Sequence, residues 1–313
     1  MTAVFIDGES GTTGLRLRGR LEGRDDVTLI SLPADLRRDP DARADAMKTA
    51  DITVLCLPDA AARDAAAIAD KAGARVIDAS SAHRTAPDWV YGMPELTHSR
   101  SAEISCASRV SVPGCHATGF ILLTAPLVRA GLIKPDAFLS VTSVTGYSGG
   151  GKNMIARYDD PARTPNDTLT EPLPYAFAQC HKHLPEMQAA TGLAHAPVFQ
   201  PIVGNFRCGM LVTVPLNLAQ FGITTADIEA VWAEAYADTP CVKALPFDAV
   251  LPDGALVPSS MTGNDGLVIT LSGGPERVLL TALYDNLGKG ASGTALECLN
   301  LMTGAPVEKS LSL

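Results

Sequence analysis

Short apolar runs alternate with alanine-rich polar stretches along the first 115 residues of the chain. The apolar runs occupy residues 4–6, 27–30, 52–57, 75–78 and 109–112. The segments between them that are compatible with helices are 15–21, 41–49 and 60–72. Because strands that alternate with helices form parallel sheets covered on both faces, this pattern predicts an α/β fold with a Rossmann-type parallel sheet.

The pattern changes after about residue 135. Residues 138–145 alternate as in a half-buried strand, and residues 146–174 are polar and rich in Gly, Asn, Asp and Pro. Because that polar stretch is too long for an ordinary connector, we expect a functional or interface loop. Further apolar or helical runs cover residues 210–216, 225–236, 268–271, 278–283 and 289–302. They predict a second, α+β domain on a mixed sheet.

Composition and charge narrow the classes of partner. The chain has 313 residues, 46% of them hydrophobic and 19% charged, with a net charge of −9. This composition is ordinary for a globular protein, and so acidic a chain is a poor candidate for binding nucleic acid or anionic lipid. No run approaches the ~18 apolar residues that span a membrane, and the N-terminus lacks the basic segment of a signal peptide. We therefore expect a cytoplasmic protein with no membrane or nucleic-acid partner.

Three glycines, Gly8, Gly11 and Gly14, follow the first predicted strand and precede the first helix. Glycine lets the backbone turn tightly and lets a pyrophosphate approach the N–H groups at the start of the helix. Hydroxyl donors in the same turn are Ser10, Thr12 and Thr13. The turn therefore predicts a dinucleotide site, and the alternative is a tight turn without a ligand.

The end of the second predicted strand bears on which dinucleotide binds. Ser31 lies there, followed closely by Asp35 and then by Arg37 and Arg38. An acid about 20 residues after the turn is typical of NAD sites, whereas a hydroxyl with adjacent arginines suits the 2′-phosphate of NADP. We favour NADP(H), although both arginines could also lie on a solvated face.

One of the seven cysteines, Cys115, ends the fifth predicted strand and begins a helix. Ligands of open α/β sheets bind at such strand ends, and a helix N-terminus lowers a thiol pKa. Cys115 is therefore a candidate nucleophile, and Cys208, beside Arg207, is the rival candidate. Alternatively, Cys115 is a buried cysteine at a strand end with no catalytic role. The odd number of cysteines and the absence of CxxC argue against disulfides or a zinc ribbon, so we expect most of the others to be buried hydrophobes.

A histidine pair supports covalent chemistry. His181 and His183 lie two residues apart, and Glu186 follows three residues later. One histidine could exchange protons with a thiolate and a reacting oxygen while Glu186 orients it. A zinc site at this pair lacks a clear third ligand, so we expect no metal. A polar turn before Pro185 is the other alternative.

Cations near loops are the candidates for binding an anionic substrate. They are Arg84, Lys152, which follows Ser148 in a glycine-rich stretch, and Arg207. Each could equally be a surface salt-bridge partner.

Together, a dinucleotide turn, a thiolate and a histidine base predict one reaction. A thiolate displaces the leaving group of an activated acyl group, and the thioester is then reduced by NADPH to an aldehyde.

The chain resembles the N-acetyl-γ-glutamyl-phosphate reductases, and within them the shorter form of the enzyme. The segments that carry the resemblance are GESGTTG at 8–14, YGMPEL at 91–96, PGCHATG at 113–119, HKHLPE at 181–186 and DNLGKGASG at 285–293. Together they span essentially the whole chain. The sequence departs from the longer form of the family at Thr12 and Thr13, where an aromatic residue is usual, and at residues 205–210.

The resemblance implies NADP-dependent reduction of N-acetyl-L-glutamyl 5-phosphate to N-acetyl-L-glutamate 5-semialdehyde in arginine biosynthesis. It implies that Cys115 is the nucleophile, that His181 or His183 is the acid/base with Glu186 beside it, and that Asn286 contacts the cofactor. The dinucleotide-binding domain is then discontinuous, with residues 1–115 and 286–313. Residues 116–285 form a catalytic and oligomerisation domain of a homo-oligomer, a dimer or tetramer.

Three other functions compete with this one. An aspartate-semialdehyde dehydrogenase shares the chemistry, but the 91–96 and 181–186 segments fit it less well. A non-enzymatic NADPH sensor would use the glycine turn alone. A cysteine hydrolase would leave that turn unexplained.

Overall fold

The computed structural model describes residues 1–164, 166–249 and 254–313. The chain divides into two compact units. Unit 1 comprises Met1–Pro94, Ser99–Gly114 and Ala291–Leu311, and unit 2 comprises Glu95–His98, Cys115–Gly290 and Ser312–Leu313.

Unit 1 contains a six-stranded parallel sheet in the order β2-β1-β3-β4-β6-β5. Its strands are β1 Thr2–Asp7, β2 Val27–Ile30, β3 Ile52–Leu55, β4 Arg75–Asp78, β5 Val90–Tyr91 and β6 Arg109–Ser111. Alternate residues of a strand point to opposite faces of a sheet. Val4 and Ile6 therefore pack into one hydrophobic cluster, while Phe5 packs into another.

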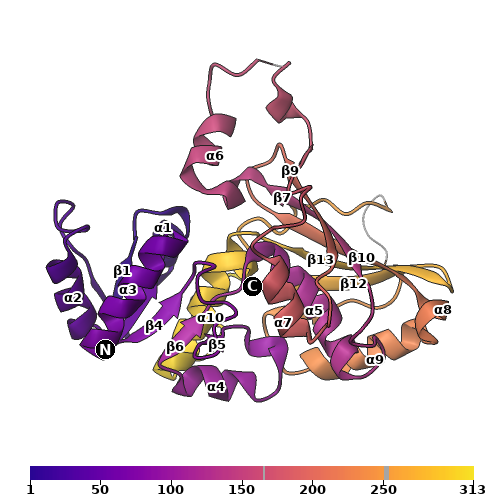
Figure 1. Ribbon diagram of the computed structural model, residues 1–313, viewed down its shortest axis with the longest axis horizontal. Coiled ribbons are helices and arrows are strands. Elements are labelled where there is room, and N and C mark those ends of the chain that lie inside the picture. The colour runs from indigo at the N-terminus through magenta and orange to yellow at the C-terminus, as the bar shows by residue number, and fades with distance from the viewer. Residues whose placement is uncertain (165, 250–253) are drawn as a thin grey trace. The chain divides into compact units, whose positions relative to one another are not determined.

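Helices cover both faces of this sheet (Figure 1). The cluster around Val4 includes residues of α1 Thr12–Leu21, α4 Arg100–Cys106 and α10 Gly293–Thr303. The cluster around Phe5 includes residues of α2 Pro40–Thr49 and α3 Asp59–Ala72. Apolar residues on both strand faces, such as the fully buried Ile52–Leu55, are the reason this sheet is parallel and enclosed.

Unit 2 contains a seven-stranded mixed sheet in the order β11-β12-β13-β10-β7-β9-β8. Its strands are β7 Ser140–Gly146, β8 Leu173–Pro174, β9 Val198–Gly204, β10 Met210–Asn217, β11 Val242–Ala244, β12 Leu267–Gly273 and β13 Arg277–Tyr284. The pairs β7/β9 and β11/β12 are parallel, and the remaining pairs are antiparallel.

The long helix α5 Cys115–Arg129 packs on the strands β10 and β13 of this sheet (Figure 1). Every residue from His116 to Val128 is buried. The helices α7 Leu184–Thr191 and α9 Thr225–Tyr236 pack against α5. Trp232 of α9 donates a hydrogen bond to the carbonyl of Leu123, 3.2 Å away. The shorter helices α6 Gly151–Tyr158 and α8 Leu218–Phe221 complete the unit.

The predicted fold class is confirmed: one sheet is parallel and the other mixed, each with helices. The stretch 146–174, expected to be a functional or interface loop, contains the helix α6 and the strand β8. The expectation that most cysteines are buried is wrong. Cys241 and Cys298 are buried, whereas Cys106 and Cys180 are exposed. Among the described residues no helix is both long and apolar enough to cross a membrane.

Candidate active site

The glycine turn of unit 1 leaves no room for a side chain at Gly8 or Gly14. Gly8 has φ +89°, and a Cβ there would lie 2.4 Å from the carbonyl oxygen of Cys56. A Cβ on Gly14 would lie 2.5 Å from the carbonyl oxygen of Gly8. Gly11, the N-cap residue of α1, donates a hydrogen bond to the same oxygen at 2.9 Å. The bare backbone at the start of a helix is the cradle that a pyrophosphate requires.

A pocket of about 330 Å³ adjoins this turn. Of the predicted cofactor-binding residues, Gly8, Ser10, Arg37 and Arg38 line it. Thr12 and Thr13 begin α1, and Ser31 lies 3.4 Å from Glu9, another residue that lines the pocket. Cations and hydroxyls beside a glycine cradle fit a dinucleotide phosphate.

Glu9 and Arg18 belong to this pocket network and were not predicted from the sequence. The Glu9 carboxylate is 2.5 Å from Arg18 and 2.7 Å from Arg37. Two arginines therefore converge on one carboxylate beside the glycine turn. A usable signal was present, since Glu9 lies within the glycine motif and Arg18 lies four residues after Gly14.

Cys115 is the first residue of α5, so its thiol lies at the positive end of the helix dipole. The hydroxyl of Tyr284 holds this first turn, because it donates to the carbonyl of Cys115 (2.6 Å) and accepts from the N–H of Gly119 (3.1 Å). A Cβ on Gly119 would lie 2.8 Å from that hydroxyl. A Cβ on Gly290 would lie 2.9 Å from the Cβ of Cys115. These contacts fix where the sulfur lies in unit 2.

His183 is the N-cap residue of α7 and is 4% exposed. Its Nε2 lies 3.9 Å from the carboxylate of Glu186, which is 1% exposed. Its backbone N–H donates to Nδ1 of His181 at 3.2 Å. The turn before Pro185 thus places both histidines and Glu186 in one small region.

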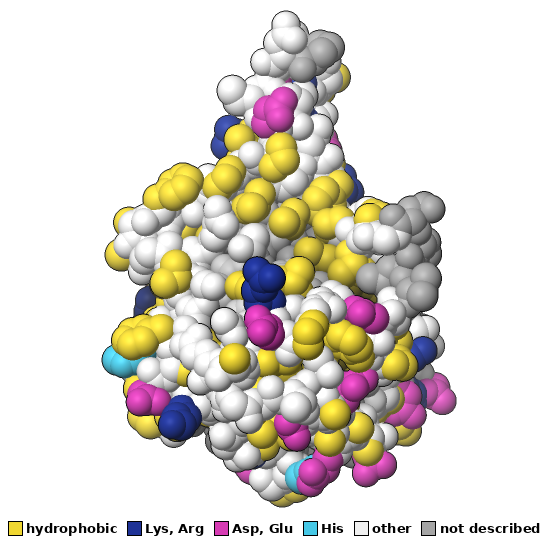
Figure 2. All heavy atoms as spheres, turned by 90° about the vertical axis from the view of Figure 1, so that its right-hand side faces the viewer, with side chains coloured by type: hydrophobic (Ala, Val, Ile, Leu, Met, Phe, Trp, Pro, Cys, Tyr) yellow, Lys and Arg dark blue, Asp and Glu magenta, His cyan; other side chains and the backbone are white. Residues whose placement is uncertain are grey.

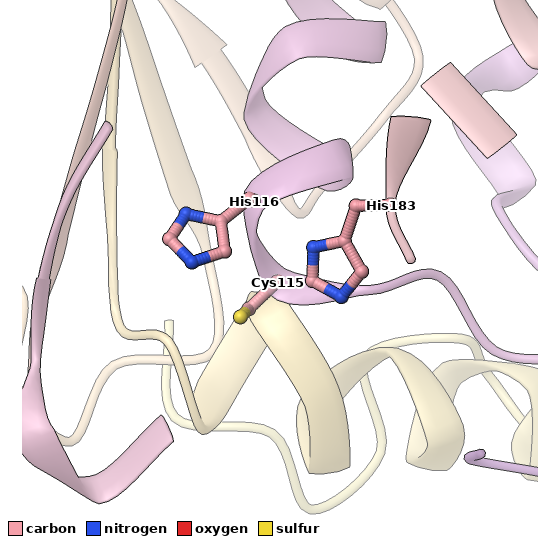
Figure 3. Close-up of side chains that lie close together, drawn as sticks. All are labelled: Cys115, His116 and His183. Atoms are coloured by element: carbon pink, nitrogen blue, oxygen red, sulfur yellow. The ribbon is translucent and has the colours of Figure 1, made fainter. Parts of the chain in front are cut away.

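The structure brings Cys115 and His183 together. Their ligand atoms, together with one from His116, all lie within 4.8 Å of one another (Figure 3). The ring of His181 lies 4.7 Å from that of His183. The candidate nucleophile and a candidate base are therefore adjacent, as covalent catalysis requires. The rival Cys208 lies with its sulfur 3.3 Å from the hydroxyl of Ser148.

His116 is the residue that sequence reasoning missed at this centre. Its Nδ1 lies 2.7 Å from the hydroxyl of Ser143, and its Nε2 lies 2.9 Å from the hydroxyl of Tyr175. Burial, and to a lesser degree His181, lowers the pKa of His116 to about 3, so the ring is neutral near pH 7. The available signal was its position directly after Cys115.

The predicted anion-binding residues lie in several places. Arg84 belongs to unit 1, where its Nε donates to the carbonyl of Val112 at 2.9 Å. Lys152 is exposed on α6. Arg207 is exposed and forms an ion pair with Asp159 at 2.7 Å.

Two predicted site residues of unit 2 are buried and hydrogen-bonded to each other. The Asn286 amide donates to the hydroxyl of Ser148 at 3.0 Å and accepts from the N–H of Gly209 at 2.9 Å. These contacts bind the segment after β13 to the loops that follow β7 and precede β10. Cofactor contact by Asn286 and substrate contact by Ser148 stay predictions.

Comparison with known proteins identifies the family. Residues 115–286 match the dimerisation domain of semialdehyde dehydrogenases, and residues 30–104 match their NAD binding domain. The chain is 46% identical over 309 residues to the N-acetyl-gamma-glutamyl-phosphate reductase of Burkholderia cenocepacia, covering 96% of this chain and 97% of that relative. It is 44% identical over 306 residues to N-acetyl-gamma-glutamyl-phosphate reductase 2 of Pseudomonas putida, with the same coverage.

Solved structures share the fold at lower identity. A probable aspartate-semialdehyde dehydrogenase from Pseudomonas aeruginosa superposes with a TM-score of 0.72 at 19% identity, covering 96% of this chain and 98% of that one. Aspartate semialdehyde dehydrogenase II from Vibrio cholerae gives a TM-score of 0.70 at 16% identity, covering 97% and 99%. These structures support the fold alone. The relatives at 44–46% identity favour the N-acetyl-gamma-glutamyl-phosphate reductases over the aspartate-semialdehyde dehydrogenases. The chain belongs to the N-acetyl-gamma-glutamyl-phosphate reductase family of semialdehyde dehydrogenases.

Proposed function

We propose that this chain catalyses NADP-dependent reduction of N-acetyl-L-glutamyl 5-phosphate to N-acetyl-L-glutamate 5-semialdehyde, with release of phosphate, as a step of arginine biosynthesis. Relatives at 44–46% identity over nearly the whole chain carry this reductase name. The observation that supports the chemistry is the adjacency of Cys115, at the start of α5, and the buried His183. In this proposal unit 1 binds the nucleotide and unit 2 carries the covalent step.

Cys115 forms the covalent intermediate. Its thiol proton passes to the His183 imidazole, and the sulfur forms a bond to the acyl carbon as the bond from that carbon to the phosphate oxygen breaks. The start of α5 stabilises the negative charge on the sulfur. The departing phosphate takes a proton from water. The product of this step is a thioester on Cys115.

His183 moves the proton in the second half of the reaction. As the thioester carbon gains a hydride, its oxygen takes the proton from His183 and a thiohemiacetal forms on Cys115. When the carbon–sulfur bond breaks, that proton returns to His183 and the aldehyde leaves. The buried carboxylate of Glu186, 3.9 Å from Nε2 of His183, stabilises the imidazolium between the two transfers.

The glycine turn, Ser10, Arg37 and Arg38 would hold the cofactor, because they surround the pocket of unit 1. NADPH, when bound, supplies the hydride. The bare backbone at Gly8 and Gly14 accommodates a pyrophosphate, and Arg37 and Arg38, which line the same pocket, suit a 2′-phosphate. The further cofactor contacts assigned to Gly11, Thr12, Thr13, Ser31 and Asn286, and substrate contacts by Arg84, Ser148, Lys152 and Arg207, belong to the proposal.

We also propose that the chain works in the cytoplasm as a homo-oligomer whose contacts involve unit 2. The family domain that matches residues 115–286 is a dimerisation domain. Figure 2 shows hydrophobic side chains exposed in several groups on the side of the molecule that it draws. In unit 2 a surface hollow of about 370 Å³ lies over the paired ends of β10 and β13, lined by residues that include Pro215 and the 45%-exposed Leu279. Such exposed apolar surface is typical of association sites.

The test is the reverse reaction: oxidation of N-acetylglutamate semialdehyde that requires both NADP and phosphate. We expect turnover with this substrate to exceed that with aspartate semialdehyde. Preference for aspartate semialdehyde would reject the substrate, and NADPH binding without turnover of either would leave only the sensor function. A hydrolase would instead use water to release N-acetylglutamate and phosphate from N-acetylglutamyl phosphate, without any need for NADPH.

Cys115→Ser tests the nucleophile. We expect its turnover to fall on the order of 10³-fold or more, because a hydroxyl is a far poorer nucleophile than a thiolate. NADPH binding, measured by fluorescence titration, should be unchanged. The matched control is Cys208→Ser, which removes the rival thiol and should keep turnover near the wild-type value. The opposite result for the two variants would assign the nucleophile to Cys208.

A further inference from the structure

The side chains around Cys115 also form the donor set of a metal site. A sulfur and two imidazole nitrogens, from Cys115, His116 and His183, all lie within 4.8 Å of one another. In Figure 3 the two rings approach the sulfur from different sides. Thiolate and imidazole are the ligands that Zn²⁺ prefers in proteins.

We propose that Cys115, His116 and His183 bind a Zn²⁺-class divalent cation in a three-ligand site with its fourth position open. The geometry requires only a small rearrangement. In a tetrahedral zinc site with bonds of about 2.0–2.3 Å, neighbouring donor atoms are about 3.5 Å apart. Donors already within 4.8 Å reach that spacing through movements on the order of 1 Å, within the range of side-chain rotation.

His116 already has the outer hydrogen-bond partner that a metal-binding imidazole needs, and His183 has a buried carboxylate near the corresponding nitrogen. Such rings usually place their second nitrogen against an oxygen, which fixes the ring and raises its basicity. Nδ1 of His116 lies 2.7 Å from the hydroxyl of Ser143, and Nε2 of His183 lies 3.9 Å from the carboxylate of Glu186. The nitrogens that face the metal are then Nε2 of His116 and Nδ1 of His183.

The partner of His116 Nε2 is consistent with this assignment. That nitrogen contacts the hydroxyl of Tyr175 at 2.9 Å. When the metal binds, it replaces this hydroxyl as the partner of Nε2.

His181 is not part of this site. Its Nδ1 already accepts the backbone N–H of His183 at 3.2 Å. The sequence argued against zinc at His181 and His183, because that pair lacked a clear third ligand. The fold supplies two other donors, Cys115 and His116, from the start of α5.

Metal binding has a direct chemical consequence. The cation displaces the thiol proton of Cys115, so the S–H bond is replaced by a metal–sulfur bond and one H⁺ is released. The sulfur electron pair that would attack an acyl carbon is then committed to the metal. This inhibitory effect rests on the proposed function of Cys115, whereas the metal binding itself does not.

The experiment titrates the metal-free chain with Co²⁺ in the absence of nucleotide and substrate, followed by displacement with Zn²⁺. We expect a near-ultraviolet absorption band from a thiolate–cobalt bond and visible bands of four-coordinate cobalt, with one equivalent bound. Zn²⁺ should abolish both. A six-coordinate spectrum without the thiolate band would overturn the proposal.

Variants assign the ligands. Cys115→Ser should lose the thiolate band, and His116→Asn should weaken Zn²⁺ binding by at least ~10-fold. The matched control is His195→Asn, because His195 is exposed and stacks on Phe138, 4.5 Å away. Its Zn²⁺ affinity should equal that of the wild type. Zn²⁺ affinity in His116→Asn within twofold of the wild type would remove His116 from the site.

The wild type alone provides a second test that does not depend on how the variants fold. Zn²⁺ should slow alkylation of Cys115 by iodoacetamide at least tenfold, and a chelator should restore the rate. An alkylation rate independent of Zn²⁺ would contradict the proposal. Turnover of the metal-free chain with N-acetylglutamate semialdehyde tests the proposed function separately, so failure of one does not imply failure of the other.

Discussion

The glycine turn of unit 1 and the Cys115 centre of unit 2 are built in opposite ways. The turn is contiguous, runs from Gly8 to Gly14, and depends on the absence of side chains. The Cys115 centre depends on side chains from distant segments. His116, for example, contacts Ser143 of β7 and also Tyr175, which follows β8.

This difference separates local from long-range determinants. A positive φ at Gly8, and the Gly8 carbonyl 2.5 Å from where a Cβ of Gly14 would lie, are demands within the turn that glycine meets. The approach of His183 to Cys115 exists only because α7 packs against α5. Substitutions at the two places should therefore change different quantities: cofactor affinity in unit 1, and chemistry or stability in unit 2.

The largest expected effect separates the two histidines of unit 2. His183→Asn should lower kcat by about 10²–10⁴-fold, because it removes the proposed acid/base next to Cys115. His181→Asn should lower kcat less, since His181 is only half-buried and its Nδ1 accepts a backbone N–H. Steady-state kinetics and NADPH titration measure both effects. Near-normal rates in both variants, or a lost affinity for NADPH, would contradict the acid/base role proposed for His183.

The next effect concerns a buried ion pair in unit 2. Lys289 and Glu95 are 2.5 Å apart, with side chains 1% and 2% exposed. Lys289→Met should reduce the free energy of unfolding by about 3–5 kcal/mol, because it leaves the Glu95 carboxylate buried without its cation. Denaturant unfolding measures the loss.

A double variant provides the control for this pair. In Lys289→Met combined with Glu95→Gln the buried charge of Glu95 is gone, so part of the lost stability should return. Lys289 also precedes Gly290, which packs against Cys115. The single variant should therefore change the alkylation rate of Cys115 while leaving NADPH affinity intact. Equal stability of the single variant and the wild type would show that the pair contributes little.

The sequence predicted elements best where the pattern was local. The predicted runs 27–30, 75–78 and 225–236 match β2, β4 and α9 to the residue. In α9 the boundary is marked by a capping box between Thr224 and Asp227. In contrast, α6 was not predicted, because the glycines and polar residues before it favour a loop.

The residues of the candidate site that could be predicted from the sequence are likewise those with a local signal. Cys115 and the 181–186 segment carry recognisable spacing, and the structure brings Cys115 and His183 together. His116 carried no pattern of its own, because its role follows from Ser143 and Tyr175, which are distant in the sequence. Glu9 was missed because its ion-pair partners, Arg18 of α1 and Arg37 after β2, come together on it only in the folded chain.

A medium effect is expected in the pocket of unit 1. Arg37→Ala should raise the KM for NADPH about tenfold and leave that for NADH unchanged, because a charge-assisted hydrogen bond contributes about 1.5 kcal/mol. The control is Arg157→Ala, in the last turn of α6, which should change neither KM. The kcat should be unchanged in both. A parallel rise in both KM values for Arg37→Ala would mean that Arg37 does not read the 2′-phosphate.

The smallest effect shows that unit 1 also contains a long-range determinant. Arg24, with a side chain 4% exposed, donates to Asp26 at 2.7 Å and to Asn300 of α10 at 2.7 Å. The Arg24 hydrogen bonds, followed by that of Lys309, hold the pKa of Asp26 well below its ordinary value of 3.8. The ionised Asp26 therefore stabilises the fold above pH 3.8, and this contribution is lost as the pH falls through the folded pKa.

Asp26→Asn should consequently lower the free energy of unfolding by about 1 kcal/mol at pH 7, a value reduced by solvent screening because the side chain is 33% exposed. The matched control is Asp25→Asn, at a side chain 91% exposed, which should change stability little. Urea unfolding at pH 7 and pH 3 checks the sign, since the gap between Asp26→Asn and the wild type should narrow at pH 3. Two results would contradict the role of the Arg24 network in linking Asp26 to α10. One is a stability difference between Asp26→Asn and the wild type that does not change with pH, and the other is an equal loss of stability in Asp26→Asn and Asp25→Asn.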